Sequence, residues 1–153
     1  MREIVLTQGK VALVDDDDFI IVSPYTWHAA RKDDLWYART RIGKISTFMH
    51  RLILGITRGI VVDHINRDGL DNRRANIRAC RQAENARNCW GQKETKGVYP
   101  YMGKWRAQIT VNRKQIYLGT FQHKQEAIEA YDTAAILHHG EFALTNAAVR
   151  LRR

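Results

Sequence analysis

Cysteine is scarce in this chain, and long hydrophobic runs are missing from it. Only two of the 153 residues are cysteines, Cys80 and Cys89, and they lack the C-x-x-C spacing of zinc sites. We therefore expect neither a structural zinc nor a disulfide framework, and a reducing compartment, the cytoplasm, fits this composition. No run of about 18 apolar residues occurs, so no transmembrane helix is predicted. Residues 1–18 indicate a strand rather than a signal peptide.

Acidic residues are outnumbered, and the excess of positive charge is unevenly distributed. The chain has 25 Lys and Arg against 16 Asp and Glu, a formal net charge of +9 and a pI near 9.9. Residues 1–49 carry seven basic and seven acidic residues, residues 50–96 carry ten and five, and residues 97–153 carry eight and four. This favours a polyanionic partner, because phosphate contacts dominate nucleic-acid affinity. A generic basic surface is the alternative, since charge alone decides little.

The first 49 residues predict a β-rich region. Short runs of aliphatic and β-branched residues predict strands at 3–7, 10–14, 19–22, 25–31, 36–41 and 45–49. Gln8-Gly9 predicts a turn between the first two strands. Asp15–Asp18 is a run of four acids, which we expect to form a solvated loop; a cation site is the alternative.

Residues 50–90 predict a strand, a loop, a second strand and a helix. A short helix at His50–Leu54 precedes them and is ended by Gly55. The expected elements are a strand at Val61–His64, a polar loop at Asn66–Arg73 with Asp68-Gly69 as its turn, a strand at Asn76–Ala79 and a helix at residues 81–89. A polar, turn-rich linker follows at Gly91–Lys96.

Four polar residues of this segment have the chemistry that phosphodiester hydrolysis needs. Asp63 offers a carboxylate to a hard divalent cation such as Mg²⁺ or Mn²⁺, and Asn85 offers a neutral amide oxygen. His64 titrates near neutral pH and can deprotonate a water molecule. Asn76 can hold the loop through hydrogen bonds to backbone groups, or orient the imidazole. Since adjacent strand residues point to opposite faces, Asp63 and His64 need a twist to converge.

These residues stand within the motifs VDHIN, LDN, NIR and ENARN, and residues 50–90 resemble the metal finger of phage and homing-type HNH endonucleases. The resemblance implies that His64 is the general base, that Asp63 and Asn85 are the metal ligands, and that Asn76 is the central asparagine. The third position of the family is often histidine, and asparagine here matches the homing subgroup. The zinc-binding cysteines of some relatives are absent.

Other residues of the finger have open roles. Apolar packing by Val61, Ile65 and Ile77 is expected to stabilise it in place of zinc. Asn88 can replace Asn85 as a ligand or act as a cap, and His50 can contact a phosphate, border the metal pocket or serve packing. The flanking arginines are expected to grip DNA phosphates, with solvated charges as the alternative: Arg73, Arg74, Arg78, Arg81 and Arg87.

Residues 97–146 predict a separate unit of three strands and one helix. The strands are expected in GVYPYMG, KWRAQITV and KQIYLGTF, with a hairpin loop at Asn112-Arg113-Lys114. A helix is expected at Lys124–His139, ended by Gly140. In the second strand, hydrophobic residues from Trp105 to Val111 alternate with polar ones, so the polar side chains should lie on the face away from the helix.

The motifs GVY, GKWRAQI, YLGTF and EAIEAYDTAAI resemble the APETALA-type DNA-binding domain of ethylene-response factors, over residues 96–146. That family lays its sheet in the major groove, which admits a β-sheet face. The resemblance implies that these side chains contact DNA: Tyr99, Tyr101, Lys104, Arg106, Gln108, Thr110, Gln115 and Tyr117. The arginine-rich first strand of the plant domain is VYPYM here, and Gln115 and Tyr117 replace its arginine and tryptophan. The plant target sequence is therefore not implied.

Together these features predict an α+β protein with two modules, residues 1–92 and 96–146. We expect a metal-dependent DNA endonuclease of the phage or mobile-element kind, in the host cytoplasm if phage-encoded. It would bind double-stranded DNA through the C-terminal sheet, as a monomer that nicks or a homodimer that breaks both strands. A DNA-binding regulator with an inactive finger and a structural DNA binder without metal dependence are the alternatives.

Overall fold

The computed structural model describes residues 1–153 except 33, 57–58, 89–93 and 151–153. The chain divides into two compact units, Met1–Asn85 and Ala86–Arg153, which are described separately below. Cys89 and part of the expected linker Gly91–Lys96 lie outside the described residues. None of the helices described is long and apolar enough to cross a membrane.

Two small antiparallel sheets form most of the first unit before residue 49. Strands β1 (Arg2–Val5) and β2 (Val11–Val14) pair across a 3-10 turn, in which Gln8 adopts a left-handed φ of 62°. Strands β3 (His28–Lys32), β4 (Leu35–Ile42) and β5 (Ile45–Phe48) form the second sheet in that order. The expected turn at Gln8-Gly9 and these five strands are confirmed, with ends shifted by up to three residues.

The expected strand at residues 19–22 is wrong, because this segment belongs to helix α1 (Asp16–Val22). Asp16, Asp17 and Asp18 occupy its first turn, where carboxylates interact favourably with the partial positive charge of a helix N-terminus. The solvated acidic loop is also wrong in part, since the Asp18 side chain is buried. Val22 packs into the core, while Ile20 remains exposed.

The segment that follows has the expected order of elements. Helix α2 (Met49–Ile53) precedes strands β6 (Val61–His64) and β7 (Ile77–Cys80), which pair antiparallel, and helix α3 (Gln82–Asn88) comes next. Ile77 is buried in the core of the first unit, but Ile65 is exposed and does not stabilise the finger by packing, contrary to expectation.

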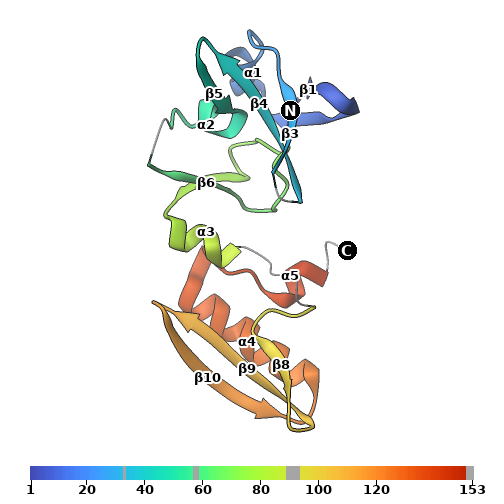
Figure 1. Ribbon diagram of the computed structural model, residues 1–153, viewed down its shortest axis with the longest axis vertical. Coiled ribbons are helices and arrows are strands. Elements are labelled where there is room, and N and C mark those ends of the chain that lie inside the picture. Colours follow the sequence, from blue (N-terminus) through green and yellow to red (C-terminus); the bar gives the residue numbers. More distant parts are fainter. Residues whose placement is uncertain (33, 57–58, 89–93, 151–153) are drawn as a thin grey trace. The chain divides into compact units, whose positions relative to one another are not determined.

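The second unit is a three-stranded sheet covered by one helix (Figure 1). Its elements are β8 (Val98–Tyr101), β9 (Lys104–Val111), β10 (Lys114–Phe121), α4 (Lys124–His139), a 3-10 turn (Gly140–Phe142) and α5 (Asn146–Arg150). Strand β9 lies in the centre, and the predicted alternation is confirmed, because Ala107 and Ile109 are buried against α4. The predicted span of the helix is also confirmed.

Two local features fix this second sheet. Asn112 and Arg113 both have positive φ, 48° and 65°, as a two-residue hairpin turn between twisted strands requires. Gly97 has a φ of +70°, and a Cβ there would lie 2.0 Å from the ring of Tyr131. Only glycine can therefore bring this backbone so close to α4.

Candidate active site and nucleic-acid interface

Asp63 and His64 are the last two residues of β6, and both side chains are buried. The Asp63 carboxylate faces Arg78, its register partner on β7, and its Oδ2 accepts hydrogen bonds from Nε at 3.0 Å and Nη2 at 2.7 Å. The Arg78 side chain is itself only 12% exposed. The carboxylate that was expected to bind a metal therefore has a guanidinium as its cationic partner within the protein.

His64 lies in a group of aromatic and histidine rings. Its ring is edge-on to His50, with centroids 4.9 Å apart, and to Tyr37, at 5.8 Å. Its Nε2 lies 3.5 Å from Oδ1 of the fully buried Asn72. Burial lowers the pKa of His64, opposed by the Asn72 contact and by the Asp63 carboxylate. The imidazole is therefore neutral at physiological pH, as a general base must be.

His50, whose role the sequence left open, belongs to this group. Its ring stacks on Phe48 with centroids 5.4 Å apart and an interplanar angle of 7°. Burial, and then the neighbouring His64, lower the pKa of His50 to about 3. Its Nδ1 is buried and has no hydrogen-bond partner among the described residues. His50 therefore supplies a neutral wall beside His64 and does not supply a charge.

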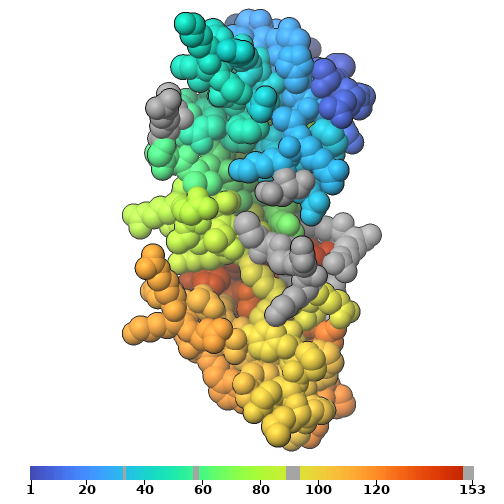
Figure 2. All heavy atoms as spheres, in the orientation of Figure 1, coloured from blue at the N-terminus to red at the C-terminus, as the bar shows by residue number. Residues whose placement is uncertain are grey.

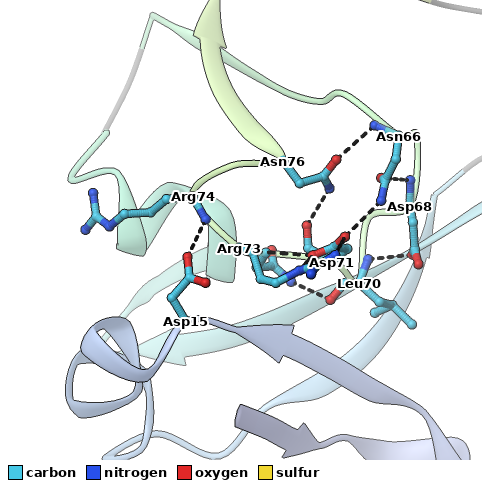
Figure 3. Close-up of polar contacts among 9 residues, drawn as sticks. Asp15, Asn66, Asp68, Leu70, Asp71, Arg73, Arg74 and Asn76 are labelled. Carbon is cyan, nitrogen blue, oxygen red and sulfur yellow. Dashed lines mark hydrogen bonds and ion pairs between the residues drawn. The ribbon is translucent and has the colours of Figure 1, made fainter. Parts of the chain in front are cut away.

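Asn76 closes the loop between β6 and β7 with two hydrogen bonds (Figure 3). Its Oδ1 accepts from the backbone N of Asn66 at 2.9 Å, and its Nδ2 donates to the backbone O of Asp71 at 2.7 Å. Asn66 also donates to the Asp71 carboxylate and accepts from the backbone N of Asp68. This is the loop-fixing geometry expected of Asn76. The network itself was not foreseen, although the motif LDN contributes Asp71 to it.

The same loop is anchored to the N-terminal part of the unit. Leu13 of β2 donates to Leu70 O at 2.8 Å and accepts from Asn72 N at 2.8 Å, so the loop adds a short parallel bridge to that strand. A Cβ at Gly69 would lie 2.3 Å from Trp36 O and 2.6 Å from the ring of Tyr37. Glycine at this turn thus lets the loop contact β4, and the β-rich region positions the finger.

An ion pair between the half-exposed Arg74 and the buried Asp18 completes the anchoring. Arg74 donates from Nε and Nη2 to Asp18, with the shortest distance 2.7 Å, and the Asp18 side chain is 1% exposed. Its backbone N donates to Asp15 at 2.8 Å (Figure 3), and Nη2 also reaches Ile53 O at 3.2 Å. Asp15 and Asp18 therefore hold the segment that leads into β7, and they do not form a solvated loop.

The flanking arginines expected to contact DNA mostly have protein partners. Arg73 pairs with Asp71 at 2.7 Å, and this guanidinium holds the pKa of the Asp71 carboxyl below its usual range. Arg74 and Arg78 pair with Asp18 and Asp63 as described, whereas Arg87 is half-buried on α3. DNA contact by Arg73, Arg74, Arg78 and Arg87 stays a prediction. Of the three arginines with ion-pair partners, Arg78 is the least accessible.

The candidate metal ligands form a less complete group than the residues around the candidate base, His64. Asn85 is half-buried in the first turns of α3, and Asn88 is buried further along the same helix. Among the described residues, no group of three or more His, Cys, Asp or Glu is arranged to hold a metal ion. Asp63 and Asn85 would thus offer two oxygen donors, which suits a magnesium ion that keeps several waters and takes a phosphate oxygen as ligand.

The outer face of the second sheet carries aromatic and basic side chains around Arg106. Register pairs it with Tyr99 and Thr120, and its guanidinium lies 3.6 Å from the ring centroid of Tyr101 and 5.7 Å from that of Tyr117. Its Nε is buried without a hydrogen-bond partner in the part of the chain that is described. In Figure 2 the yellow and light-orange atoms of the strands cover most of the visible surface of this unit.

The remaining residues expected at this interface lie on the same strands. Lys104, Thr110 and Gln115 are exposed, and Gln108 is half-buried opposite Tyr117. The Tyr117 hydroxyl is hydrogen-bonded to Thr120 at 2.8 Å, which helps to fix the ring beside Arg106. The structure therefore brings all eight predicted side chains to one sheet, with a cation–π cluster at its centre.

Comparison with known proteins gives two separate resemblances. The model of a family described as HNH endonuclease matches residues 48–87. An ethylene-responsive transcription factor-like protein of Arabidopsis thaliana is 44% identical over 57 residues, 36% of this chain and 25% of that protein. The AP2-like ethylene-responsive transcription factor ANT of Arabidopsis thaliana is 50% identical over 46 residues, 29% of this chain and 8% of that protein.

A rice protein extends the second resemblance. A putative AP2/ERF and B3 domain-containing protein of Oryza sativa subsp. japonica is 44% identical over 54 residues, 35% of this chain and 17% of that protein. The chain thus spans a quarter or less of these curated relatives. It is similar to HNH endonucleases over residues 48–87 and to AP2/ERF proteins over a short segment.

Proposed function

We propose that this protein is a metal-dependent DNA endonuclease whose first unit hydrolyses phosphodiester bonds and whose second unit binds DNA. One observation carries the proposal: His64, buried and neutral, stands next to Asp63 at the end of β6, on a loop fixed by Asn76 and anchored to β2 and α1. The match of residues 48–87 to an HNH endonuclease family supports it.

In this proposal His64 takes a proton from the attacking water. A low pKa keeps the imidazole unprotonated, and the rings of Tyr37 and His50 restrict its orientation. Asn76 acts as a positioning residue, because it holds the loop and does not touch the reacting atoms. A rigidly held base is needed, since small misplacements of a catalytic group cost large factors in rate.

Asp63 and Asn85 would hold the metal ion, Mg²⁺ or Mn²⁺. When bound, such an ion neutralises charge on the scissile phosphate and stabilises the leaving oxygen. Metal and Arg78 compete for Asp63 in this scheme, because the guanidinium already occupies Oδ2. A released Arg78 would remain close enough to the bound phosphate to pair with it.

The second unit would supply affinity and part of the sequence preference through the sheet around Arg106. We infer that the similarity to AP2/ERF proteins lies here, since the motifs typical of that family fall in residues 96–146. A monomer with one finger would nick one strand. We further propose a homing-type enzyme of a phage or mobile element, which cleavage mapping on candidate host and phage DNA would test.

Metal dependence tests the proposed chemistry. The full chain should nick supercoiled plasmid with Mg²⁺ or Mn²⁺ and should stop in chelator. Asp63→Ala should cut little at any metal concentration, whereas Asn85→Ala should be partly rescued by high metal, since a neutral ligand contributes less. Equal cutting with and without chelator would exclude this mechanism.

A DNA-binding regulator with an inactive finger is the second candidate. The Asp63–Arg78 ion pair favours this candidate, because the guanidinium can neutralise the Asp63 carboxylate without a metal ion. This candidate predicts duplex binding without nicking at any metal concentration, and equal affinity in Mg²⁺ and in chelator. The same plasmid assay, read beside a gel shift, distinguishes the two.

A further inference from the structure

The first unit has a basic hollow that lies apart from the residues so far assigned to DNA. It has a volume of about 590 Å³ and is formed on the sheet β3–β4–β5. Among the described residues no acidic one lines it, although Arg31 pairs with Asp34 beside it at 3.5 Å. Four of its lining residues are arginine or lysine, and the full set is His28, Ala29, Ala30, Arg31, Arg39, Thr40, Arg41, Lys44 and Ser46.

Strand register places the central members of this set on one face. Arg39 lies opposite His28 on β3 and Phe48 on β5, and Arg41 lies opposite Ser46. The intervening residues Ala38 and Thr40 are buried on the other face, toward the core. Within the described part of the chain, neither Arg39 nor Arg41 has an ion-pair partner, in contrast to Arg73, Arg74 and Arg78.

The same face leads to His64. Tyr37 precedes Arg39 by two residues on β4 and so shares its side of the sheet. Its ring contacts Phe48, with centroids 5.7 Å apart, and His64, at 5.8 Å. Phe48 in turn stacks on His50. The ring contacts therefore run from Tyr37 and Phe48, beside Arg39 in the sheet, to the buried His64.

The net charge of residues 1–49 does not reveal this basic face. Residues 1–49 are neutral overall, but four of their seven acids are Asp15–Asp18, whose members lie in or next to α1 and include the buried partner of Arg74. Because these acids lie at α1, they do not neutralise the basic side chains on the sheet face. A concave face lined by basic side chains attracts a polyanion.

We propose that this face, centred on Arg39, Arg41 and Lys44, binds backbone phosphates of duplex DNA and guides the strand to His64. The inference rests on the proposed function for the identity of the polyanion. Backbone contacts position a duplex without reading its sequence, so this surface would set where the cut falls relative to the sites read elsewhere. Arginine at these positions matches phosphate better than a point charge does.

The test uses the full chain in chelator, with a random-sequence duplex as the probe. Arg39→Gln/Arg41→Gln removes two charges from the face. Arg2→Gln/Lys10→Gln removes two charges elsewhere and is the control: Arg2 is on β1, where it pairs with Asp16, and Lys10 lies over Trp36, on the face of β4 opposite to Arg39. The measured quantity is the slope of log Kobs against log salt concentration, which changes by about 0.9 for each B-DNA phosphate that the protein no longer neutralises.

The face variant should flatten the slope by about 1.8, which corresponds to two phosphates, and the control should leave it nearly unchanged. On a second duplex, of defined sequence and with the wild-type nick position mapped in Mg²⁺, the face variant should also lose the hydroxyl-radical protection next to that position. Equal slopes for the two variants would overturn the inference. Because the slope is measured without metal, it is separate from nuclease activity: an intact slope effect with no nicking refutes the proposed chemistry alone.

Discussion

Oδ2 of Asp63 accepts hydrogen bonds from Nε and Nη2 of Arg78, its direct partner across the β6–β7 pair. The pair is buried on both sides, since the Asp63 and Arg78 side chains are 6% and 12% exposed. Removal of one member of such a pair leaves an uncompensated charge. The pair thus gives a way to detect metal at Asp63 without relying on activity.

Arg78→Gln should lower the free energy of unfolding by about 3–5 kcal/mol in chelator. Mg²⁺ should then raise the Tm of this variant more than that of the wild type, because a ligand that binds only the folded state stabilises it. Thermal unfolding followed by circular dichroism measures both effects. Arg74→Gln is the control: it removes the more exposed arginine that pairs with the buried Asp18 outside the site, and Mg²⁺ should not restore its stability. Equal magnesium effects in both variants would argue against metal binding at Asp63.

The Arg74–Asp18 pair should couple the finger to α1. Arg74→Gln leaves the buried Asp18 carboxylate without its cationic partner and should be destabilising, by less than a fully buried pair because Arg74 is 54% exposed. Asp18→Asn/Arg74→Gln should cost less than Arg74→Gln alone, because no charge remains buried. Urea unfolding of the four proteins of this cycle measures the coupling. Simple additivity of the two single changes would mean that the pair contributes little.

The stability of the first unit should fall with acid because of its two buried imidazoles, His50 and His64. The pKa of His50 is lowered from 6.5 to about 3 by burial, and that of His64 is lowered for the same reason. The unfolded chain therefore binds more protons, so stability is complete above pH 6.5 and is lost as pH falls below it. Each imidazole contributes a slope of up to about 1.4 kcal/mol per pH unit.

His50→Phe keeps a ring on Phe48 and removes one titrating group, so the slope of the unfolding free energy against pH between about pH 6 and pH 5 should become smaller. Urea unfolding at several pH values gives this slope. His138→Gln is the control, since His138 is exposed and its replacement should leave the slope unchanged. A His50→Phe slope equal to that of the wild type would show that His50 is already protonated in the folded state.

Arg106 should contact a DNA base with a guanidinium that neighbouring side chains already hold in position. Tyr101 and Tyr117 restrict its guanidinium, so Arg106→Ala should cost about 1–3 kcal/mol on a selected site, and less on sites mutated at the contacted base. Tyr101→Leu should produce part of that loss, and Lys104→Ala should weaken all duplexes alike. Titrations on matched and mismatched duplexes separate these outcomes. A uniform loss for Arg106→Ala with a flatter salt slope would mean that it contacts only phosphate.

The sequence predicted elements wherever local pattern and packing agreed. The period-two alternation of β9, the apolar spacing of α4 and the Asn112-Arg113 turn were all foreseen. Phe19–Val22 was misassigned because its β-branched residues resemble a strand, while the carboxylates before it favour the start of a helix. The carboxylates at the helix N-terminus and the packing of Val22 into the core outweighed the β preference of the apolar run there.

At the candidate site, residue types were predictable but partners were not. The roles proposed for Asp63, His64, Asn76 and Asn85 rest on residue chemistry and on the resemblance to HNH endonucleases. The ion pair of Asp63 with Arg78, the contact of His50 with His64 and the pairing of Arg74 with Asp18 depend on register and tertiary packing. The last joins residues 56 positions apart, which no local pattern can indicate.

The most direct measurement of the central claim is plasmid nicking by His64→Ala in Mg²⁺, with duplex affinity measured in parallel by gel shift. Loss of a general base costs on the order of a hundred- to ten-thousand-fold in rate, while DNA binding does not require the imidazole. We therefore expect nicking to fall by that factor with affinity nearly unchanged. Nicking close to that of the wild type, or a wild-type protein that binds DNA and never nicks it, would contradict the account.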